Sequence, residues 1–271
     1  MYMEKIDNIF DNAVKGLRIP FWAFKPDHWS LAFLRGLEKV SQNWEEKRVW
    51  EIGVGTGINL LVLRQITSKV EWYFSDYDER AVPLAIHNLG ADRRGFNPLR
   101  GSWDLVSAPK DTSVPKVNAI FACIPQVPSK IDLSLEDRLA HYYDPTHYPE
   151  ADLNTIGLGL CQTLLVKAKD ALMPGGQVTL NLGGRPGLPR LKSLFKDAGY
   201  WPNIVWSETI PQHSETSLAT LAALEDSGHD AFEFFTDRKG EMRINASEAE
   251  KLRLQKKEVY HNIYVIEGMM M

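Results

Sequence analysis

The chain has 271 residues, 44% of them hydrophobic and 24% charged, with a formal net charge of -4. This length suits one α/β domain with additions, or at most two small domains. The charge balance lacks the positive field that nucleic-acid binding usually needs, so we expect no nucleic-acid partner. Cys123 and Cys161 form no C-x-x-C pair and the seven histidines show no ligand spacing, so we expect neither a disulfide framework nor a metal site. No apolar run approaches a membrane span, and the first residues lack a signal-peptide core, which predicts a cytoplasmic protein without membrane contact.

Residues 1–45 are rich in tryptophan and phenylalanine and are expected to form an N-terminal helical cap. Its helix opens at Pro26-Asp27 and places Trp29, Phe33 and Leu37 on one apolar face. From residue 46 to residue 271, strand and helix signals alternate, which predicts a doubly wound, Rossmann-like α/β sheet with a C-terminal strand extension. The expected strands are 49–52, 70–75, a weakly marked 98–101, 117–123, 177–182, 203–210, 231–237 and 259–268, and the expected helices begin at 58 or cover 78–88, 157–172, 188–200 and 247–258.

The most informative segment is a buried strand followed by a turn with three glycines, Gly53, Gly55 and Gly57. Glycines at alternate positions let the backbone turn sharply and approach a ligand closely. A dinucleotide-binding loop would carry a further glycine where this chain has Ile58, so a pyrophosphate ligand is disfavoured. Glu51 would repel a phosphate but attract an ammonium group, which favours a cofactor that bears an amino acid. A purely structural glycine turn is the alternative.

The pattern E-x-G-x-G-x-G resembles the first motif of the class I methyltransferases, which use S-adenosylmethionine. In a doubly wound sheet, ligands bind beyond the carboxyl ends of the strands, so the residues that follow each strand are candidates. Asp76 is expected to accept both ribose hydroxyls, and Asp78 to cap the next helix. Tyr77 is a candidate to lie against the adenine, or else packs on the sheet rim. Asp104 is a candidate to accept the adenine amino group, or else lies in a surface turn.

The fourth predicted strand ends in Cys123-Ile124-Pro125-Gln126, where many class I enzymes that methylate nitrogen carry Asn-Pro-Pro-Tyr. In that motif the asparagine accepts hydrogen bonds from the protons of the nitrogen and orients its lone pair. Cys123 is a poor acceptor. Because a thioether has no proton to orient, this sequence favours a sulfur acceptor.

Several segments together resemble the N-terminal methyltransferase domain of plant methionine S-methyltransferases and their free-standing bacterial counterparts. These are KPDHWSLAF, the cofactor motifs, CIPQ, GLGL, NLGGRPG, FEFF and, weakly, YHNIYVI. The resemblance implies conversion of methionine to S-methylmethionine, which in some bacteria feeds synthesis of dimethylsulfoniopropionate. The plant proteins also carry a long aminotransferase-like region that this chain lacks.

The implied reaction is an in-line transfer between two sulfurs that needs no general base, so we expect no catalytic acid or base. Arg185 is the best candidate to clamp the carboxylate of methionine, because its guanidinium binds carboxylates with two donors. His28 and His261 lie in resembling segments but are expected to be packing or surface residues. The cofactor-binding residues that we predict are Glu51, Gly53, Gly55, Gly57, Asp76, Tyr77, Asp104 and Cys123.

The predicted substrate-binding residues are Arg185, Gln126, Pro125, Trp29, Tyr142 and Tyr148. Gln126 has loop capping as its alternative role. The aromatic residues, with Tyr143, are candidates to stabilise the cation by their faces, with simple packing as the alternative. A different small thioether, an amine or amide nitrogen, or a non-catalytic role in binding S-adenosylmethionine are alternative functions. The oligomeric state is left open.

Overall fold

The computed structural model describes residues 2–92, 94–101, 103–108, 112–128, 143–148, 151–213, 218–228 and 231–271. Its centre is one sheet with the strand order β3-β2-β1-β4-β5-β9-β7-β8, in which β6 also pairs with β9. The strands β3, β2, β1, β4 and β5 run parallel to one another, whereas β9 is antiparallel to both β5 and β6. The strands are β1 Arg48–Ile52, β2 Glu71–Ser75, β3 Phe96–Pro98, β4 Val117–Ala122, β5 Leu172–Gly183, β6 Tyr200–Pro211, β7 Phe234–Phe235, β8 Arg243–Ile244 and β9 Tyr260–Met270. The doubly wound α/β fold predicted from the sequence is confirmed.

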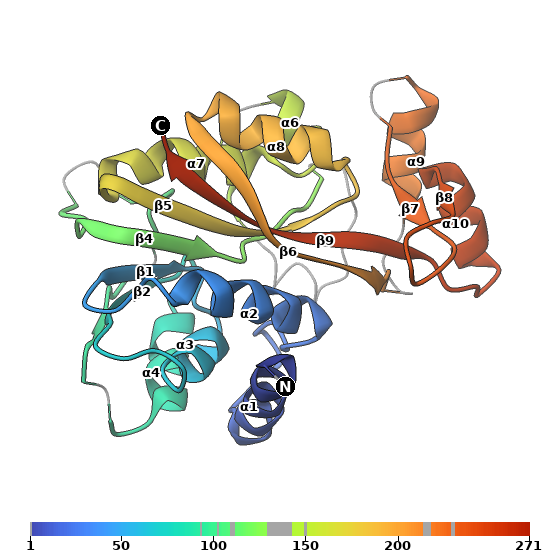
Figure 1. Ribbon diagram of the computed structural model, residues 1–271. Coiled ribbons are helices and arrows are strands. Elements are labelled where there is room, and N and C mark those ends of the chain that lie inside the picture. Colours follow the sequence, from blue (N-terminus) through green and yellow to red (C-terminus); the bar gives the residue numbers. More distant parts are fainter. Residues whose placement is uncertain are drawn as a thin grey trace.

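Helices cover both faces of the sheet (Figure 1). On one face lie α2 (His28–Ser41), α3 (Ile58–Leu63) and α4 (Ala81–Leu89), with α1 (Tyr2–Gly16) packed outside them. On the other lie α6 (Ala151–Thr155), α7 (Gly159–Ala171) and α8 (Leu188–Asp197). Each face has its own apolar core of buried side chains. Burial on both sides is what a parallel sheet requires, so the strand ends are the part left open for a ligand.

The N-terminal segment is joined tightly to the sheet. The side chain of Asp27 accepts hydrogen bonds from the backbone N–H groups of Trp29 and Ser30, so α2 begins where the sequence predicts. Gly36 lies so close to β9 that an added Cβ would come within 2.6 Å of the Val265 side chain. Arg35 bonds both Asp7 of α1, at 2.8 Å, and Glu208 of β6, at 2.6 Å. We propose a division into residues 1–45 and 46–271, whose side chains pack together in the apolar core of one face of the sheet.

Two local predictions are wrong. The third strand covers Phe96–Pro98 rather than 98–101, and α4 begins at Ala81, so Asp78 is not its N-cap. The Asp78 carboxylate instead accepts the backbone N–H of Arg80 at 2.9 Å and pairs with the Arg80 guanidinium. This Asx-type turn takes up the residues that would have formed the first helical turn.

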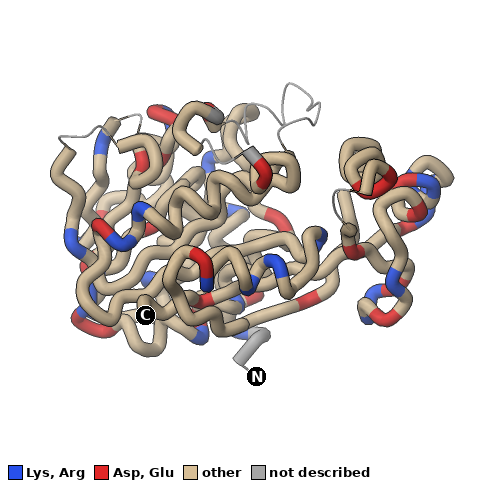
Figure 2. Tube along the Cα trace, turned by 90° about the horizontal axis from the view of Figure 1, so that it is seen from above, with Lys and Arg blue, Asp and Glu red and all other residues tan. Residues whose placement is uncertain are grey.

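The hairpin of β6 and β9 continues past the sheet and carries a small C-terminal extension beyond the carboxyl ends of the parallel strands (Figure 1). The extension consists of α9 (Ala219–Asp226), β7, β8 and α10 (Ala246–Leu254), and α9 is absent from the sequence prediction. In Figure 2, basic and acidic residues alternate over the main body without a broad region of one sign. No helix among the described residues is long and apolar enough to cross a bilayer.

Candidate active site

The three glycines form a loop at the carboxyl end of β1. Their φ angles are 75° at Gly53, 51° at Gly55 and 78° at Gly57, and residues other than glycine rarely adopt such positive values. A Cβ on Gly57 would also lie 3.1 Å from the Cβ of Ala85 in α4. Above Gly55, in contrast, no heavy atom lies within 4 Å of an added Cβ. The loop therefore packs against α4 on one side and leaves open space on the other.

Asp76 connects this loop to the end of β2. Its Oδ2 accepts the backbone N–H of Gly55 at 2.8 Å, and its Oδ1 accepts that of Asp78 at 2.9 Å. The pKa of Asp76 is raised to about 7, chiefly by burial and also by the nearby carboxylates of Asp104 and Asp78, while the two backbone hydrogen bonds oppose the rise. The carboxyl group thus lies beside the glycine loop, at the strand end where a ribose-binding residue is expected.

Glu51 is a buried carboxylate with one unsatisfied oxygen. Glu51 is only 1% exposed, and its Oε1 accepts a hydrogen bond from the Asn59 side chain at 2.7 Å. Among the described residues, Glu51 Oε2 and Asn59 Oδ1 have no hydrogen-bond partner. Burial raises the pKa of Glu51 well above its usual range. Sequence analysis missed Asn59, whose signal was a lone polar side chain in the apolar first turn of INLLVL.

Asp104 and Tyr77 meet through a third residue, Tyr143. The Tyr143 hydroxyl donates to Asp104 Oδ1 at 2.5 Å, and its ring stacks on that of Tyr77 with centroids 4.3 Å apart. Asp104 is only 1% exposed and also accepts the backbone N–H of Val106, so it does not lie in a surface turn. Tyr148 donates to the Tyr143 carbonyl and belongs to the same cluster. The structure thus brings Tyr77 and Asp104 together, and their contact with an adenine stays a prediction. Tyr142 lies outside the described residues.

Beyond β4, Cys123 meets an asparagine from β5. The Asn181 Nδ2 lies 3.6 Å from the Cys123 sulfur and donates to the Trp29 carbonyl at 3.0 Å. Asn181 Oδ1 is buried and has no partner among the described residues. Burial raises the pKa of Cys123 to about 12, so the group is a neutral thiol at pH 7. Sequence analysis missed Asn181, which was visible only as a lone asparagine in an apolar strand.

Gln126 joins the loops that follow β4 and β5. Its Nε2 donates to the Gly183 carbonyl at 3.1 Å, and its Oε1 accepts the Gly183 N–H at 2.8 Å. Both ends of the amide are therefore engaged with backbone, which is the loop-capping role. Pro125, between Ile124 and Gln126, is partly buried at the same edge. Contacts of Gln126 and Pro125 with a substrate stay predictions.

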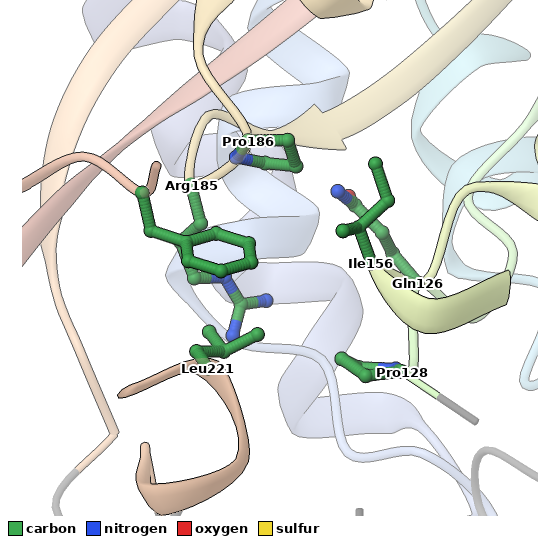
Figure 3. Close-up of a pocket in the computed structure, with 7 residues that line it drawn as sticks. Gln126, Pro128, Ile156, Arg185, Pro186 and Leu221 are labelled. Atoms are coloured by element: carbon green, nitrogen blue, oxygen red, sulfur yellow. The ribbon is translucent and has the colours of Figure 1, made fainter. Parts of the chain in front are cut away.

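Arg185 projects into a small pocket between the main body and the C-terminal extension (Figure 3). Its guanidinium makes no hydrogen bond or ion pair with any described residue. Burial lowers the pKa of Arg185 to about 10, which still leaves it charged at pH 7. The pocket is lined by Gln126, Pro128, Ile156, Arg185, Pro186, Leu221 and Phe232. A partly buried cation that has no partner among the described residues indicates a site for an anionic group.

The two histidines lie in different surroundings. His28 is exposed at the first turn of α2, as expected for a surface residue. His261 of β9 is 3% exposed, with its ring centroid 5.8 Å from that of Trp29. Within the described part of the chain, no three histidine, cysteine or acidic side chains are grouped as metal ligands would be.

Comparisons with known proteins agree with this arrangement. In an alignment 254 positions long that covers 83% of this chain, the sequence is 28% identical to a methionine S-methyltransferase of Zea mays, and the match covers 23% of that protein. The chain thus spans about a quarter of the length of this relative. It is also 28% identical over 174 residues to a release factor glutamine methyltransferase of Deinococcus radiodurans, covering 64% of this chain and 56% of that protein. No family model matches.

Among solved structures, a candidate RNA methyltransferase from Pyrococcus horikoshii, PH1948, superimposes with a TM-score of 0.53. The match covers 99% of this chain and 100% of that chain at 14% sequence identity, so it bears on the fold alone. The chain is therefore similar in sequence to methionine S-methyltransferases over most of its length, and it has the Rossmann-like fold of the class I methyltransferases.

Proposed function

We propose that this chain transfers a methyl group from S-adenosylmethionine to the thioether sulfur of methionine and forms S-methylmethionine. The observation that carries the proposal is the Arg185 guanidinium, which has no partner in the described ranges and shares the carboxyl edge of the sheet with the glycine loop and Glu51. The methyl donor follows from the methyltransferase relatives and from the fold. The sulfur acceptor is supported by the relative named methionine S-methyltransferase and by Cys123 in place of the nitrogen-orienting asparagine.

The residues at this edge fit the parts of the donor. Glu51 Oε2, buried without a partner, suits the ammonium group of the donor, and Asp76 beside the glycine loop suits its ribose hydroxyls. Asp104, Tyr77 and Tyr143 offer a carboxylate and aromatic faces for the adenine. The open space above Gly55 lets a ligand approach the backbone.

The chemistry requires alignment and exclusion of water rather than proton transfer. A lone pair of the acceptor sulfur forms the new S–CH₃ bond while the donor S–CH₃ bond breaks, and the positive charge passes from one sulfur to the other. No proton is released, so the neutral thiol of Cys123 is not needed as a base. Holding two reactants in line can contribute on the order of 7 to 11 kcal/mol. The Trp29 ring, next to Gly183 at this edge, is available to stabilise the shared cation.

The direct test is incubation of the purified chain with methyl-labelled donor and methionine. We expect labelled S-methylmethionine to accumulate with multiple turnovers. A chain that binds the donor but labels neither methionine nor any other acceptor would be a non-catalytic binding protein, and the proposal would be wrong. Supply of dimethylsulfoniopropionate synthesis stays a prediction from the sequence resemblance.

A nitrogen acceptor is the second candidate function. The side-chain amide of Asn181 lies next to Cys123, and its Oδ1 has no partner among the described residues. This oxygen is the kind of acceptor that orients an amine or amide proton. The similarity to a release factor glutamine methyltransferase points the same way. In a competition assay with equal concentrations of methionine, a second small thioether and a glutamine-containing peptide, we expect label mainly in methionine. Label mainly in the peptide would favour the nitrogen acceptor.

Replacement of Glu51 by glutamine is expected to stabilise the unliganded protein and to weaken donor binding. The folded-state pKa of Glu51 lies above its unfolded value, so the stability linked to its protonated form is lost as pH rises through the folded-state pKa. Glutamine stays neutral, and we expect a melting temperature a few degrees higher at pH 8. Affinity for S-adenosylhomocysteine, measured by calorimetry, should fall about ten- to a hundredfold, because a hydrogen bond to a charged group is lost.

Glu71→Gln is the matched control, because the Glu71 side chain in β2 is 43% exposed. It should change neither quantity appreciably. Unchanged affinity in Glu51→Gln would contradict the assignment of Glu51 to the ammonium group.

A further inference from the structure

The imidazole of His261 has two ring nitrogens, and neither has a hydrogen-bond partner in the part of the chain that the structure describes. Both atoms are buried and lack a hydrogen bond to any described residue. The residue lies on β9, opposite Ile210 of β6, just beyond the last pairing of β9 with β5 at Gly183 and Ile263. Buried polar atoms are rarely left unpaired, because each costs free energy comparable to a lost hydrogen bond. Two such atoms on one ring, at the carboxyl edge of the sheet, indicate a position that suits a polar group of a ligand.

The surroundings of His261 define what that ligand carries. The ring of Trp29 covers it, and an added Cβ on Gly183 would lie 2.8 Å from Trp29 and 3.5 Å from an Arg185 nitrogen. Trp29, His261 and Arg185 therefore gather around the end of β5. Burial and the positive charge of Arg185 lower the pKa of His261 well below its usual range, so the ring is neutral and keeps one lone pair. The Nδ2 of Asn181 donates a hydrogen bond to the Trp29 carbonyl. The Oδ1 of the same amide has no partner among the described residues and is a further acceptor beside Trp29.

We propose that His261 accepts a hydrogen bond from the α-ammonium group of the methyl acceptor while Arg185 binds its carboxylate, so that the site selects a free, zwitterionic amino acid. The inference rests on the proposed function and adds a recognition residue to it. The Arg185 cation near the neutral His261 ring matches a carboxylate next to an ammonium group. A methionine residue inside a protein has neither charge, and a simple thioether acid has only the carboxylate. Both should be poor acceptors.

The first measurement uses the unmodified chain. We expect kcat/KM for methionine to exceed that for its des-amino analogue, which keeps the thioether and the carboxylate, by at least about tenfold. Methionine turnover without preference over the analogue would overturn the proposal for His261 and leave the proposed function intact. Absence of methionine turnover would instead refute the proposed function.

The second measurement compares variants. His261→Phe keeps an aromatic ring against Trp29 but removes both nitrogens, and it should lower kcat/KM for methionine about ten- to a hundredfold, mainly through KM. Turnover of the des-amino analogue should change less than about threefold. His261→Asn or His261→Gln, which place a polar atom near one or the other ring nitrogen, should recover part of the loss.

His87→Phe is the control, because His87 is exposed on α4. It should behave as the unmodified chain does with both acceptors. Binding of S-adenosylhomocysteine identifies the folded variants. If His261→Phe reduces turnover of both acceptors equally, or if neither polar variant differs from it, the residue has a packing role and the proposal is wrong.

Discussion

Arg185→Ala is expected to raise the KM for methionine by about thirtyfold or more while leaving the affinity for S-adenosylhomocysteine within about twofold. Removing one partner of a buried, hydrogen-bonded charge pair typically costs about 2 to 5 kcal/mol, which corresponds to about thirtyfold to several thousandfold. Arg185 has no carboxylate partner among the described residues that would compensate, and it lines the pocket away from the glycine loop. Steady-state kinetics over a range of methionine concentrations, with donor saturating, measures the effect.

Arg185→Lys separates charge from geometry. Lysine keeps the positive charge but lacks the planar pair of donors, so we expect only a small part of the affinity to return. Arg190→Ala, which removes an exposed arginine at the start of α8, is the matched control and should leave KM nearly unchanged. Equal losses of methionine and donor binding in Arg185→Ala would refute the carboxylate clamp.

The second large effect concerns Asp76 and depends on pH. With a pKa of about 7, the carboxyl group of Asp76 is about half protonated at pH 7 in the unliganded protein. Ribose hydroxyls donate to the ionised form, so affinity for S-adenosylhomocysteine should rise as pH increases toward 7 and level off above it. Below the pKa, a single titrating group gives a change of about tenfold per pH unit. Calorimetric titrations from pH 5.5 to 8.5 test this.

Asp76→Asn should remove most of that pH dependence and lower the affinity at pH 8 by about ten- to a hundredfold. Each Asp76 oxygen already accepts a backbone N–H, so the amide NH₂ of asparagine also faces a donor and disturbs the glycine loop. Asp92→Asn, at an exposed turn, is the control. A pH dependence that persists unchanged in Asp76→Asn would show that a different group titrates.

The raised pKa of Asp76 also predicts how the stability of the unliganded chain changes with pH. The folded-state pKa of Asp76 is raised above its unfolded value of 3.8. The stability contributed by its protonated form is therefore fully present below about pH 4 and is lost as pH rises through about 7. A carboxylate that is unfavourable in the unliganded protein and is stabilised by a bound ligand is common at functional sites.

The cofactor half of the candidate site was predictable because each of its parts is a local pattern. A buried strand, alternate glycines and a helix start lie within residues 49–58, and the strand-end rule identified Asp76 from the segment around it. The same rule identified Cys123 and Arg185. Prediction was weaker where a turn competed with a helix, as at Asp78, whose bonds to Arg80 delay the start of α4.

The acceptor half was not predictable in the same way. Asn181 meets Cys123 across 58 residues of sequence, and Tyr143 meets Asp104 across 39. Gln126 was named from the sequence, but its two bonds to Gly183 show a loop-holding role that no spacing in the chain reveals. His261 was noticed as a lone histidine, and its significance depends on the absence of a partner for its nitrogens.

The sequence by itself therefore determined the doubly wound fold, the glycine loop and the residues that follow each parallel strand, because strand periodicity and glycine turns are set by neighbouring residues. Only the tertiary structure decided which polar groups are satisfied and which are left free at the open edge. That depends on packing between distant segments: β9 brings His261 to Trp29, and the end of β5 brings Asn181 to Cys123 and Arg185 into the pocket. Burial then converts these placements into chemistry, because a charge or hydrogen-bonding atom removed from water needs a partner, and a bound ligand can supply one.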